Sequence, residues 1–131
     1  MPSSIFTAAR PLITRDLAER CIDAVRSGWD GAIAAAPMTD TVKEADASGR
    51  VVRTLDRSVL WRIQTPQAFD ADTLRRALDV PDDILAAATD DASLVEAVGG
   101  SVRVVEAPPE NIKVTTPHDL QFAEALLRAR S

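Results

Sequence analysis

The chain has 131 residues, which suits one domain with a core of its own, and its 46% hydrophobic and 27% charged residues are ordinary for a globular protein. Its formal net charge of −5 argues against non-specific nucleic-acid binding, which needs clustered positive charge. The apolar runs are too short to span a bilayer and the N-terminus lacks a signal-peptide pattern, so we expect a cytoplasmic protein with no membrane partner.

The N-terminal third predicts a helix followed by a buried strand. Thr14 is a suitable N-cap and Gly28 a suitable stop for the helix between them. Its core-facing stripe consists of Leu17, Cys21 and Val25. The apolar run over residues 31–36 is bounded by Asp30 and Pro37, which favours a buried strand. The alternation of strand, helix and strand predicts an α/β fold with a mainly parallel sheet and crossover helices.

Cys21 and His118 are the only residues of their types, which excludes an intrachain disulfide and argues against a structural zinc site. We expect Cys21 to be a small core residue, because it falls on the apolar stripe of the first helix. We expect His118 to lie on the surface, in the first turn of the last helix.

Residues 39–65 predict a polar arm. Two extended stretches, 39–45 and 50–55, flank the link Ala47-Ser48-Gly49, and a Gly in a short polar link indicates a hairpin because it tolerates positive φ. Such a hairpin has little apolar surface to bury, so we do not expect it to be stable alone. We therefore expect it to protrude and to pack on something else, foremost a second copy of the chain.

The arm is also locally basic. From Lys43 to Arg62 there are five basic and three acidic residues, so this segment carries +2 and the rest of the chain −7. One interpretation is a solvated hairpin face. The other is a local site for an anionic group such as a phosphate.

A turn at Asp56-Arg57-Ser58 precedes a strand over residues 61–69. Pro66 removes a ladder donor, so we expect this strand to be an edge or to end there. Asp70 is a suitable cap for a helix over residues 71–79. One face of that helix carries Leu74 and Leu78.

Residues 80–83 predict a loop, after which Asp90 or Asp91 caps a helix that runs through Val98. The pair Gly99-Gly100 closes this helix.

The C-terminal part predicts a strand over residues 101–106, a short extended segment over 111–114 and a last helix. Thr116-Pro117, with an acid at position 119, is a strong helix start. The buried face of this helix is expected to carry Leu120, Ala123 and Leu127.

Six motifs follow one another along the chain: AARPL, TDTVKE, RTLDRSVLW, QTPQAF, TDDASLVEAVGG and NIKVTTPHDL. In this order and spacing the chain resembles the methylerythritol phosphate cytidylyltransferase family of non-mevalonate isoprenoid biosynthesis. The resemblance implies a partial Rossmann-like nucleotidyltransferase sheet with crossover helices and a β-hairpin dimerisation arm. It also implies transfer of a cytidylyl group from CTP to methylerythritol phosphate with release of pyrophosphate, a divalent metal such as Mg²⁺, and a homodimer.

The family begins with a nucleotide-binding half that carries a Gly-rich loop, and this sequence has no such half. We therefore expect a single truncated domain over residues 1–131, corresponding to the C-terminal portion of the family.

The resemblance implies that Thr41, Arg57 and Thr65 bind the substrate phosphate, reaching across the dimer from the arm. A guanidinium suits a bidentate hold on phosphate, and hydroxyls add neutral donors. On the residues alone, the favoured interpretation of Arg57 is a turn residue paired with Asp56 or Asp40, and that of the two threonines is ordinary strand residues; the joint motif pattern favours the functional interpretation.

The resemblance further implies a catalytic role for Lys113, beside the α-phosphate of the nucleotide, where it stabilises charge in the transition state. Thr89 matches a hydroxyl that lines the substrate pocket, and Ala8 and Arg10 match contacts to the substrate diol and phosphate. The alternatives are a loop lysine for Lys113 and a helix cap or pre-cap role for Thr89.

One departure from the family lies at Phe6-Thr7, where the family has His-Asp. That Asp helps to hold the metal and the substrate, and the neutral hydroxyl of Thr7 is a poor ligand for a hard cation. We therefore expect no metal ligand from this chain.

Two hypotheses follow. In the first, the chain belongs to the cytidylyltransferase family and needs a missing N-terminal half for any activity. In the second, it is a non-catalytic remnant that dimerises or binds a phosphorylated metabolite. The truncation and Thr7 favour the second for the chain by itself, whereas the motifs favour the first.

Overall fold

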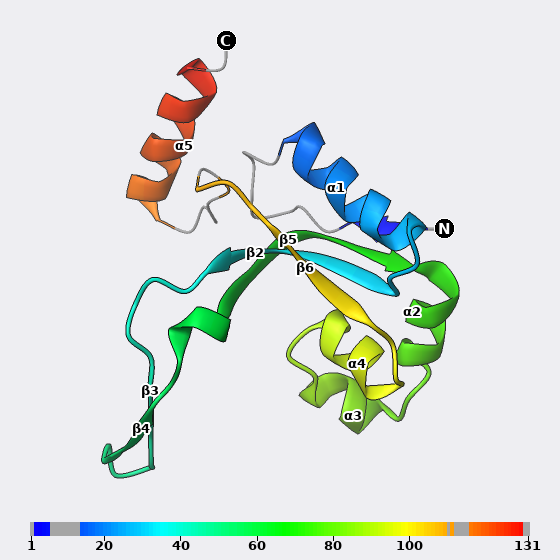
Figure 1. Cartoon of the computed structure of the whole chain (residues 1–131), viewed down its shortest axis with the longest axis horizontal. Coiled ribbons are helices and arrows are strands. Elements are labelled where there is room, and N and C mark those ends of the chain that lie inside the picture. The colour runs from blue at the N-terminus through cyan, green and yellow to red at the C-terminus, as the bar shows by residue number, and fades with distance from the viewer. Residues whose placement is uncertain (1, 6–13, 110, 112–115, 130–131) are drawn as a thin grey trace.

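A four-stranded sheet organises the molecule, with strand order β1-β5-β2-β6 (Figure 1). The computed structural model describes residues 2–5, 14–109, 111 and 116–129. The strands are β1 (Pro2–Ile5), β2 (Gly31–Pro37), β5 (Trp61–Asp70) and β6 (Val102–Glu106). The helices are α1 (Arg15–Arg26), α2 (Ala71–Leu78), α3 (Asp82–Ala87), α4 (Asp91–Ala97) and α5 (Pro117–Ala129).

The α/β class is confirmed, but the expectation of a mainly parallel sheet is wrong. Only β2 and β6 pair in parallel within the described sheet, whereas β5 runs antiparallel to both β1 and β2. The reason lies in the connection: β2 and β5 are joined through the polar arm, which returns the chain directly, and no crossover helix lies between them. Helices lie between β5 and β6 instead.

Helix α1 covers one face of the sheet, and α2 and α4 cover the other (Figure 1). Alternate residues of β2 divide between the two layers, as the period of a strand requires: Ala32 and Ala34 face α1, and Ile33 faces α2 and α4. The α1 layer contains the predicted stripe of Leu17, Cys21 and Val25, all buried. The second layer is centred on Phe69, which is fully buried.

Side-chain caps begin the main helices as the sequence predicts. The Thr14 Oγ1 accepts from the Leu17 N–H at 3.2 Å, and the Asp70 Oδ2 accepts from the Thr73 N–H at 3.1 Å. Asp90, rather than Asp91, caps α4 by accepting from the Ser93 N–H at 2.8 Å. At α5, Thr116 and Asp119 form a reciprocal capping box: each side chain accepts from the other residue's backbone N–H at 3.1 Å.

Several local expectations are corrected. Strand β5 lies inside the sheet, between β1 and β2, and is not an edge. Residues 80–83 are not all loop, because α3 begins at Asp82. Leu78 is 39% exposed, and Ala77 takes the inward position on α2.

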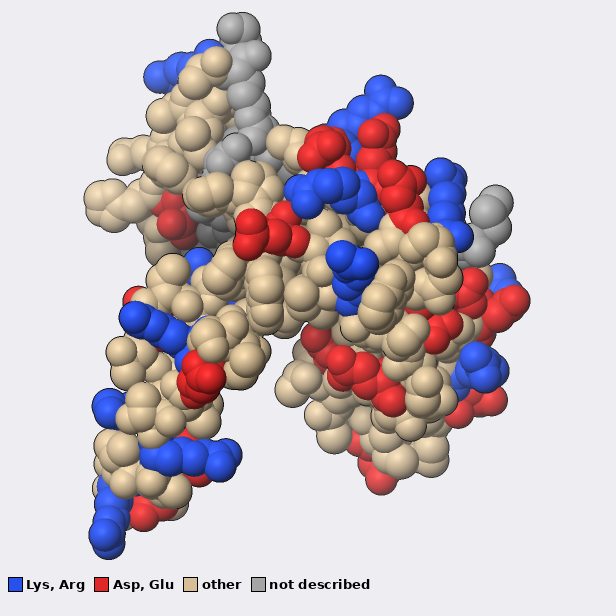
Figure 2. All heavy atoms as spheres, in the orientation of Figure 1, with Lys and Arg blue, Asp and Glu red and all other residues tan. Residues whose placement is uncertain are grey.

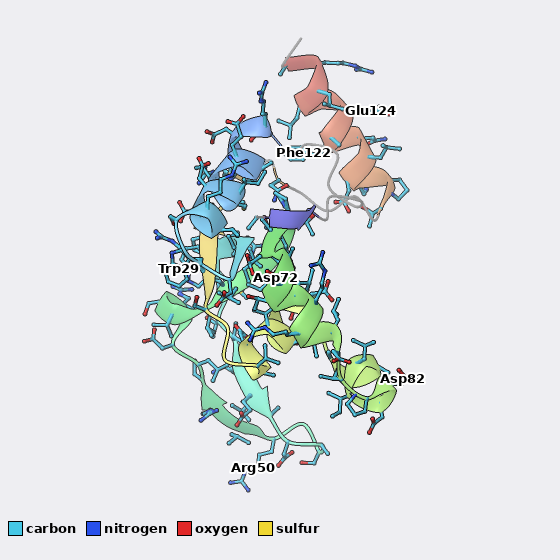
Figure 3. The ribbon with its side chains drawn as sticks, turned by 90° about the vertical axis from the view of Figure 1, so that its right-hand side faces the viewer. Trp29, Arg50, Asp72, Asp82, Phe122 and Glu124 are labelled. Atoms are coloured by element: carbon cyan, nitrogen blue, oxygen red, sulfur yellow. The ribbon has the colours of Figure 1, made fainter. Side chains whose placement is uncertain are left out.

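Helix α5 buries less than expected. Ala123 is buried, but Leu120 and Leu127 are about half exposed, at 51% and 45%. Phe122, labelled in Figure 3, is 50% exposed. His118 is exposed, as expected. The expected extended segment over residues 111–114 lies mostly outside the described residues.

The arm stands apart from the rest of the molecule as its own two-stranded sheet, β3 (Lys43–Ala45) and β4 (Val51–Thr54) (Figures 1 and 2). Every residue of both strands is exposed. The tip turns as predicted: Gly49 has φ +89°, and the Asp46 Oδ1 accepts from the backbone N–H groups of Ser48 and Arg50. The hairpin is therefore held by its own hydrogen bonds and has no apolar core.

Among the described residues, no helix combines the length and apolar character needed to cross a bilayer.

Candidate functional site

A bulge interrupts β5 in the middle of the QTPQAF motif. Ala35 of β2 faces Ile63, but Ile33, two residues earlier on β2, faces Gln67. Two residues of β2 thus span four of β5, which leaves two extra residues on the β5 side. Because a bulge takes residues out of the ladder, the segment over residues 64–66 must find its hydrogen bonds elsewhere.

Side chains replace the missing ladder partners at this bulge. The Gln64 carbonyl accepts from the Gln67 Nε2 at 3.0 Å, and the Thr65 carbonyl accepts from the Asn111 Nδ2 at 2.9 Å. The Pro66 carbonyl faces the Cys21 Sγ at 3.9 Å, a weak contact. Each of three consecutive backbone carbonyls therefore faces a side-chain donor. These contacts fix the conformation of the bulge.

The thiol of Cys21 lies buried beside this bulge, and its burial makes it unreactive. Burial raises the pKa of Cys21 to about 11, although the nearby Arg20 charge acts in the opposite direction. The thiolate is the nucleophilic form, so Cys21 is a core residue, as the sequence predicts, and not a candidate nucleophile.

The Thr65 hydroxyl is a polar group of the bulge for which the described residues provide no hydrogen bond. Its Oγ1 is buried and has no hydrogen-bond partner there. A buried hydroxyl without a partner costs about 1–3 kcal/mol, which a ligand oxygen could recover. The hydroxyl can donate to an anionic oxygen, which is the chemistry that phosphate binding needs.

Arg57 sits at the base of the arm in a single 3-10 turn, η1 (Arg57–Val59). Its Nη1 donates to the Thr39 carbonyl at 2.9 Å, and this bond joins the segment that leaves β2 to the segment that returns to β5. The neighbouring Asp56 carboxylate accepts instead from the Ser58 hydroxyl and backbone N–H, and these bonds lower the pKa of Asp56. Among the described residues, therefore, no carboxylate neutralises the Arg57 charge.

Thr41 lies on the arm, and Thr89 lines a cleft to which Ile33 and Ile63, at the two ends of the bulge, also contribute. Thr41 is exposed on the outgoing side of the arm. Thr89 lines a cleft of about 400 Å³ between the base of the arm and α4, next to Asp90. Because Asp90 is the cap of α4, Thr89 occupies the pre-cap position, which is one of the two alternative roles given for it. Asp90 and Glu96 also line this cleft, and their negative charge disfavours an anion there.

A second cleft, of about 520 Å³, opens between the start of α1 and the end of β6. Arg20 lines it and is held by the Glu106 carbonyl at 3.0 Å and the Asp16 carboxylate at 3.1 Å. Thr14 and Pro109 line it as well. These two residues directly adjoin segments 6–13 and 110–115, which contain further candidates.

Thr7, Ala8, Arg10 and Lys113 lie outside the described residues, so the geometry does not bear on them. Within the described ranges, no three His, Cys, Asp or Glu side chains gather in a group that could hold a metal ion.

Sequence reasoning overlooked three amides that build the bulge: Gln64, Gln67 and Asn111. All three belong to motifs quoted for the family resemblance, but only their neighbours Thr65 and Lys113 were singled out. The available signal was a pair of amides on either side of a strand proline, which suggests that side chains replace ladder bonds.

The comparisons with known proteins agree on one family. The family model described as 2-C-methyl-D-erythritol 4-phosphate cytidylyltransferase matches residues 4–129. The chain belongs to the 2-C-methyl-D-erythritol 4-phosphate cytidylyltransferase family. Relatives of this name from Rubrobacter xylanophilus and a Synechococcus strain are 52% and 47% identical over 126 and 127 residues. These alignments cover 96% and 97% of the chain but 54% and 56% of the relatives.

Solved structures of this cytidylyltransferase family share the fold. A structure of 4-diphosphocytidyl-2C-methyl-D-erythritol synthase from Anaerococcus prevotii has a TM-score of 0.79 at 35% identity, over 92% of this chain and 55% of that one. The 2-C-methyl-D-erythritol 4-phosphate cytidylyltransferase of Thermus thermophilus has a TM-score of 0.76 at 35% identity, over 92% and 58%. The chain thus spans about half the length of the relatives it matches, and its mixed α/β sheet is part of a nucleotidyltransferase fold.

Proposed function

We propose that this chain supplies the substrate-phosphate part of a cytidylyltransferase that transfers a cytidylyl group from CTP to 2-C-methyl-D-erythritol 4-phosphate and releases pyrophosphate. The observation that carries the proposal is the buried, unmet Thr65 hydroxyl, held at a built bulge in a chain of this family. Because the chain spans about half of its relatives, turnover requires parts of the family fold beyond these residues.

The proposed roles divide by chemistry. Arg57, with a charge that no described carboxylate neutralises, binds the substrate phosphate together with the hydroxyls of Thr41 and Thr65. Lys113 offsets the charge that builds up on the transferring phosphoryl group.

Three further roles complete the pocket. Thr89 lines its wall, and Ala8 and Arg10 contact the diol and the phosphate. In support of the role of Thr89, this residue lines the cleft between the base of the arm and α4.

The functional unit that we propose is a homodimer formed through the arm. Val51 and Val52 are 52% and 59% exposed on a hairpin without a core, and a second copy would give them a surface to bury against. The sheet would then be the C-terminal part of a Rossmann-like nucleotidyltransferase sheet. The cytoplasmic location expected from the sequence stays a prediction.

The divalent metal, Mg²⁺ in the first instance, is also a prediction. The described residues do not fit a metal site, because they bring no cluster of hard oxygen ligands together, and Thr7 offers only a neutral hydroxyl. We therefore assign no step of the proposed reaction to a metal ion held by this chain.

The alternative function is a non-catalytic remnant that dimerises or binds a phosphorylated metabolite. Thr7 in place of the family carboxylate favours it. A pyrophosphate-release assay separates the two: we expect no release from CTP and methylerythritol phosphate by this chain alone, and release when the N-terminal half of a relative is supplied. Absence of release in the supplemented reaction would favour the remnant.

Binding of the substrate phosphate is tested by calorimetric titration of 2-C-methyl-D-erythritol 4-phosphate into the chain. We expect Arg57→Ala to weaken binding roughly tenfold or more, because a charge-assisted hydrogen bond is lost. The matched control is Arg75→Ala, which removes an exposed arginine that pairs with Asp72 on α2. Equal affinities for the wild type and Arg57→Ala would remove Arg57 from the site.

A further inference from the structure

Asn111 joins two motifs that lie far apart in the sequence. Its Nδ2 donates to the Gln64 Oε1 at 2.9 Å and to the Thr65 carbonyl at 2.9 Å, across 47 and 46 residues. The side chain is 1% exposed. A buried amide nitrogen with two acceptors uses both of its hydrogens, so its orientation is fixed.

These two hydrogen bonds fix the part of β5 that is not paired with β2. The bulge removes Gln64 and Thr65 from the β2 ladder, so the ladder does not set their conformation. Gln67 fixes the Gln64 carbonyl, and Asn111 fixes both the Gln64 side chain and the Thr65 carbonyl. The backbone that carries the Thr65 hydroxyl is therefore oriented by side-chain amides.

We propose that Asn111 is a positioning residue that holds the buried Thr65 hydroxyl in the orientation needed to bind the substrate's phosphate group. This inference rests on the proposed function for the role of Thr65, and it assigns to Asn111 no contact with the substrate. It also explains why an amide stands at this position: the site presents two oxygen acceptors side by side, and only a group with two donors meets both.

The side-chain chemistry defines the test variants. Asn111→Asp keeps the shape but places an acceptor-only carboxylate against the Thr65 carbonyl, so that contact becomes repulsive, whereas the Gln64 amide can turn and donate its Nε2 to the new acceptor. Gln64→Met is the milder second variant, because it removes one acceptor of the clamp and leaves Asn111 bound to Thr65. The matched control is Gln121→Glu, the same amide-to-acid change at an exposed position on α5.

The first measurement is made by NMR on the ligand-free chain. It determines the χ1 rotamer of Thr65 from three-bond couplings. We expect one rotamer in the wild type and in Gln121→Glu, and averaging among rotamers in Asn111→Asp and, less strongly, in Gln64→Met. A single unchanged rotamer in Gln64→Met and in folded Asn111→Asp would overturn the proposal. This readout needs no ligand, so it decides the role of Asn111 even if the proposed function fails.

The second measurement is calorimetric titration with 2-C-methyl-D-erythritol 4-phosphate, with inorganic phosphate as a second probe. We expect Asn111→Asp to weaken binding at least about tenfold, because a displaced binding group loses most of its effect. Since Asn111 acts through Thr65, the double variant with Thr65→Val should bind no more weakly than Thr65→Val alone.

The outcomes of the two measurements are distinct. Fully additive losses in the double variant would overturn the positioning role, because Asn111 would then act independently of Thr65. Absence of binding by the wild type would count against the proposed function and not against the Asn111 clamp, which the rotamer measurement tests separately.

Discussion

The four-stranded sheet and the two-stranded arm are stabilised by different interactions. The four-stranded sheet is covered on both faces, and Phe69, Leu17 and Val95 are fully buried around it. The arm has no buried residue in either strand and is held by surface contacts, such as the Arg53–Glu44 pair at 3.1 Å. Exposed pairs of this kind contribute about 0–1 kcal/mol. Burial of apolar side chains therefore stabilises the body, whereas the arm has no core of its own.

The charge distribution follows the same division. Lys and Arg side chains gather along the arm in Figure 2, and Arg50 lies at its far tip in Figure 3. Acidic side chains dominate around α2–α4, where Figure 3 labels Asp72 and Asp82. The locally basic arm can thus hold an anion that the acidic body would repel.

The largest expected effect tests the body. Phe69→Ala removes the ring between the sheet and the helices α2 and α4, and we expect it to lower the free energy of unfolding by about 3–5 kcal/mol. Arg53→Ala in the arm, which removes the exposed pair with Glu44, is the contrasting variant, with an expected change within about 0.5 kcal/mol. Urea unfolding followed by circular dichroism measures both. Similar losses for the two variants would break the distinction between body and arm.

A smaller effect is expected at a helix cap of the body. Thr14→Ala removes the acceptor for the Leu17 N–H, so we expect a loss of about 1 kcal/mol in the free energy of unfolding. Thr14→Ser keeps the hydroxyl and should restore nearly all of it. Equal stability of the alanine and serine variants would show that the cap does not contribute.

The loss of stability at low pH tests the same difference between body and arm, because each region contains a carboxylate whose pKa is lowered by hydrogen bonds. Hydrogen bonds from Thr73 hold the pKa of Asp70 below its usual value, and bonds from the Ser48 hydroxyl, followed by the Arg50 and Ser48 amides, do the same for Asp46. A lowered folded-state pKa stabilises the fold above the unfolded-state pKa, and this stability is lost as the pH falls through the folded-state value.

We therefore expect Asp70→Asn, which keeps a good cap but cannot titrate, to reduce the loss of global stability below about pH 4. Asp46→Asn should leave that loss unchanged, because the arm opens without unfolding the body. Urea titrations of the wild type, Asp70→Asn and Asp46→Asn between pH 5 and pH 2.5 measure how the free energy of unfolding depends on pH. A flattened global profile for Asp46→Asn would mean that arm and body unfold as one unit.

The smallest effect on global stability is expected at the arm tip. Gly49→Ala forces a side chain into φ +89°, which costs roughly 1–2 kcal/mol within the turn. We expect faster amide exchange in β3 and β4, with no change in the midpoint of thermal unfolding. Unchanged exchange in the arm would show that the turn does not hold the hairpin.

The sequence was most informative where structure is local. The caps Thr14, Asp70 and Thr116 and the stripe of α1 were all predicted, because each depends on residues within one or two turns of the chain. The short helix α3 was missed, because Pro81 before it favoured a loop and its six residues bury none of their side chains.

The site was predicted less completely, for a physical reason. Thr65 was singled out through its motif, but the contacts that orient it come from Asn111, 46 residues away, and from a register shift against β2. Neither a long-range contact nor a bulge leaves a periodic pattern in the sequence. The direction of β5 was wrong for a related reason, since the arm was not recognised as the direct connection from β2.

The central claim is that the arm of one copy completes the phosphate site of another, and a mixing experiment tests it most directly. Chains with Arg57→Ala in the arm and chains with Arg10→Ala outside the arm are each titrated with 2-C-methyl-D-erythritol 4-phosphate, then unfolded together, refolded as an equimolar mixture and titrated again. If the site is shared between copies, random pairing gives intact sites in about a quarter of all positions, so binding with wild-type affinity reappears in the mixture. A mixture that binds no better than the separate variants, although the wild type binds, would contradict a site built from two copies.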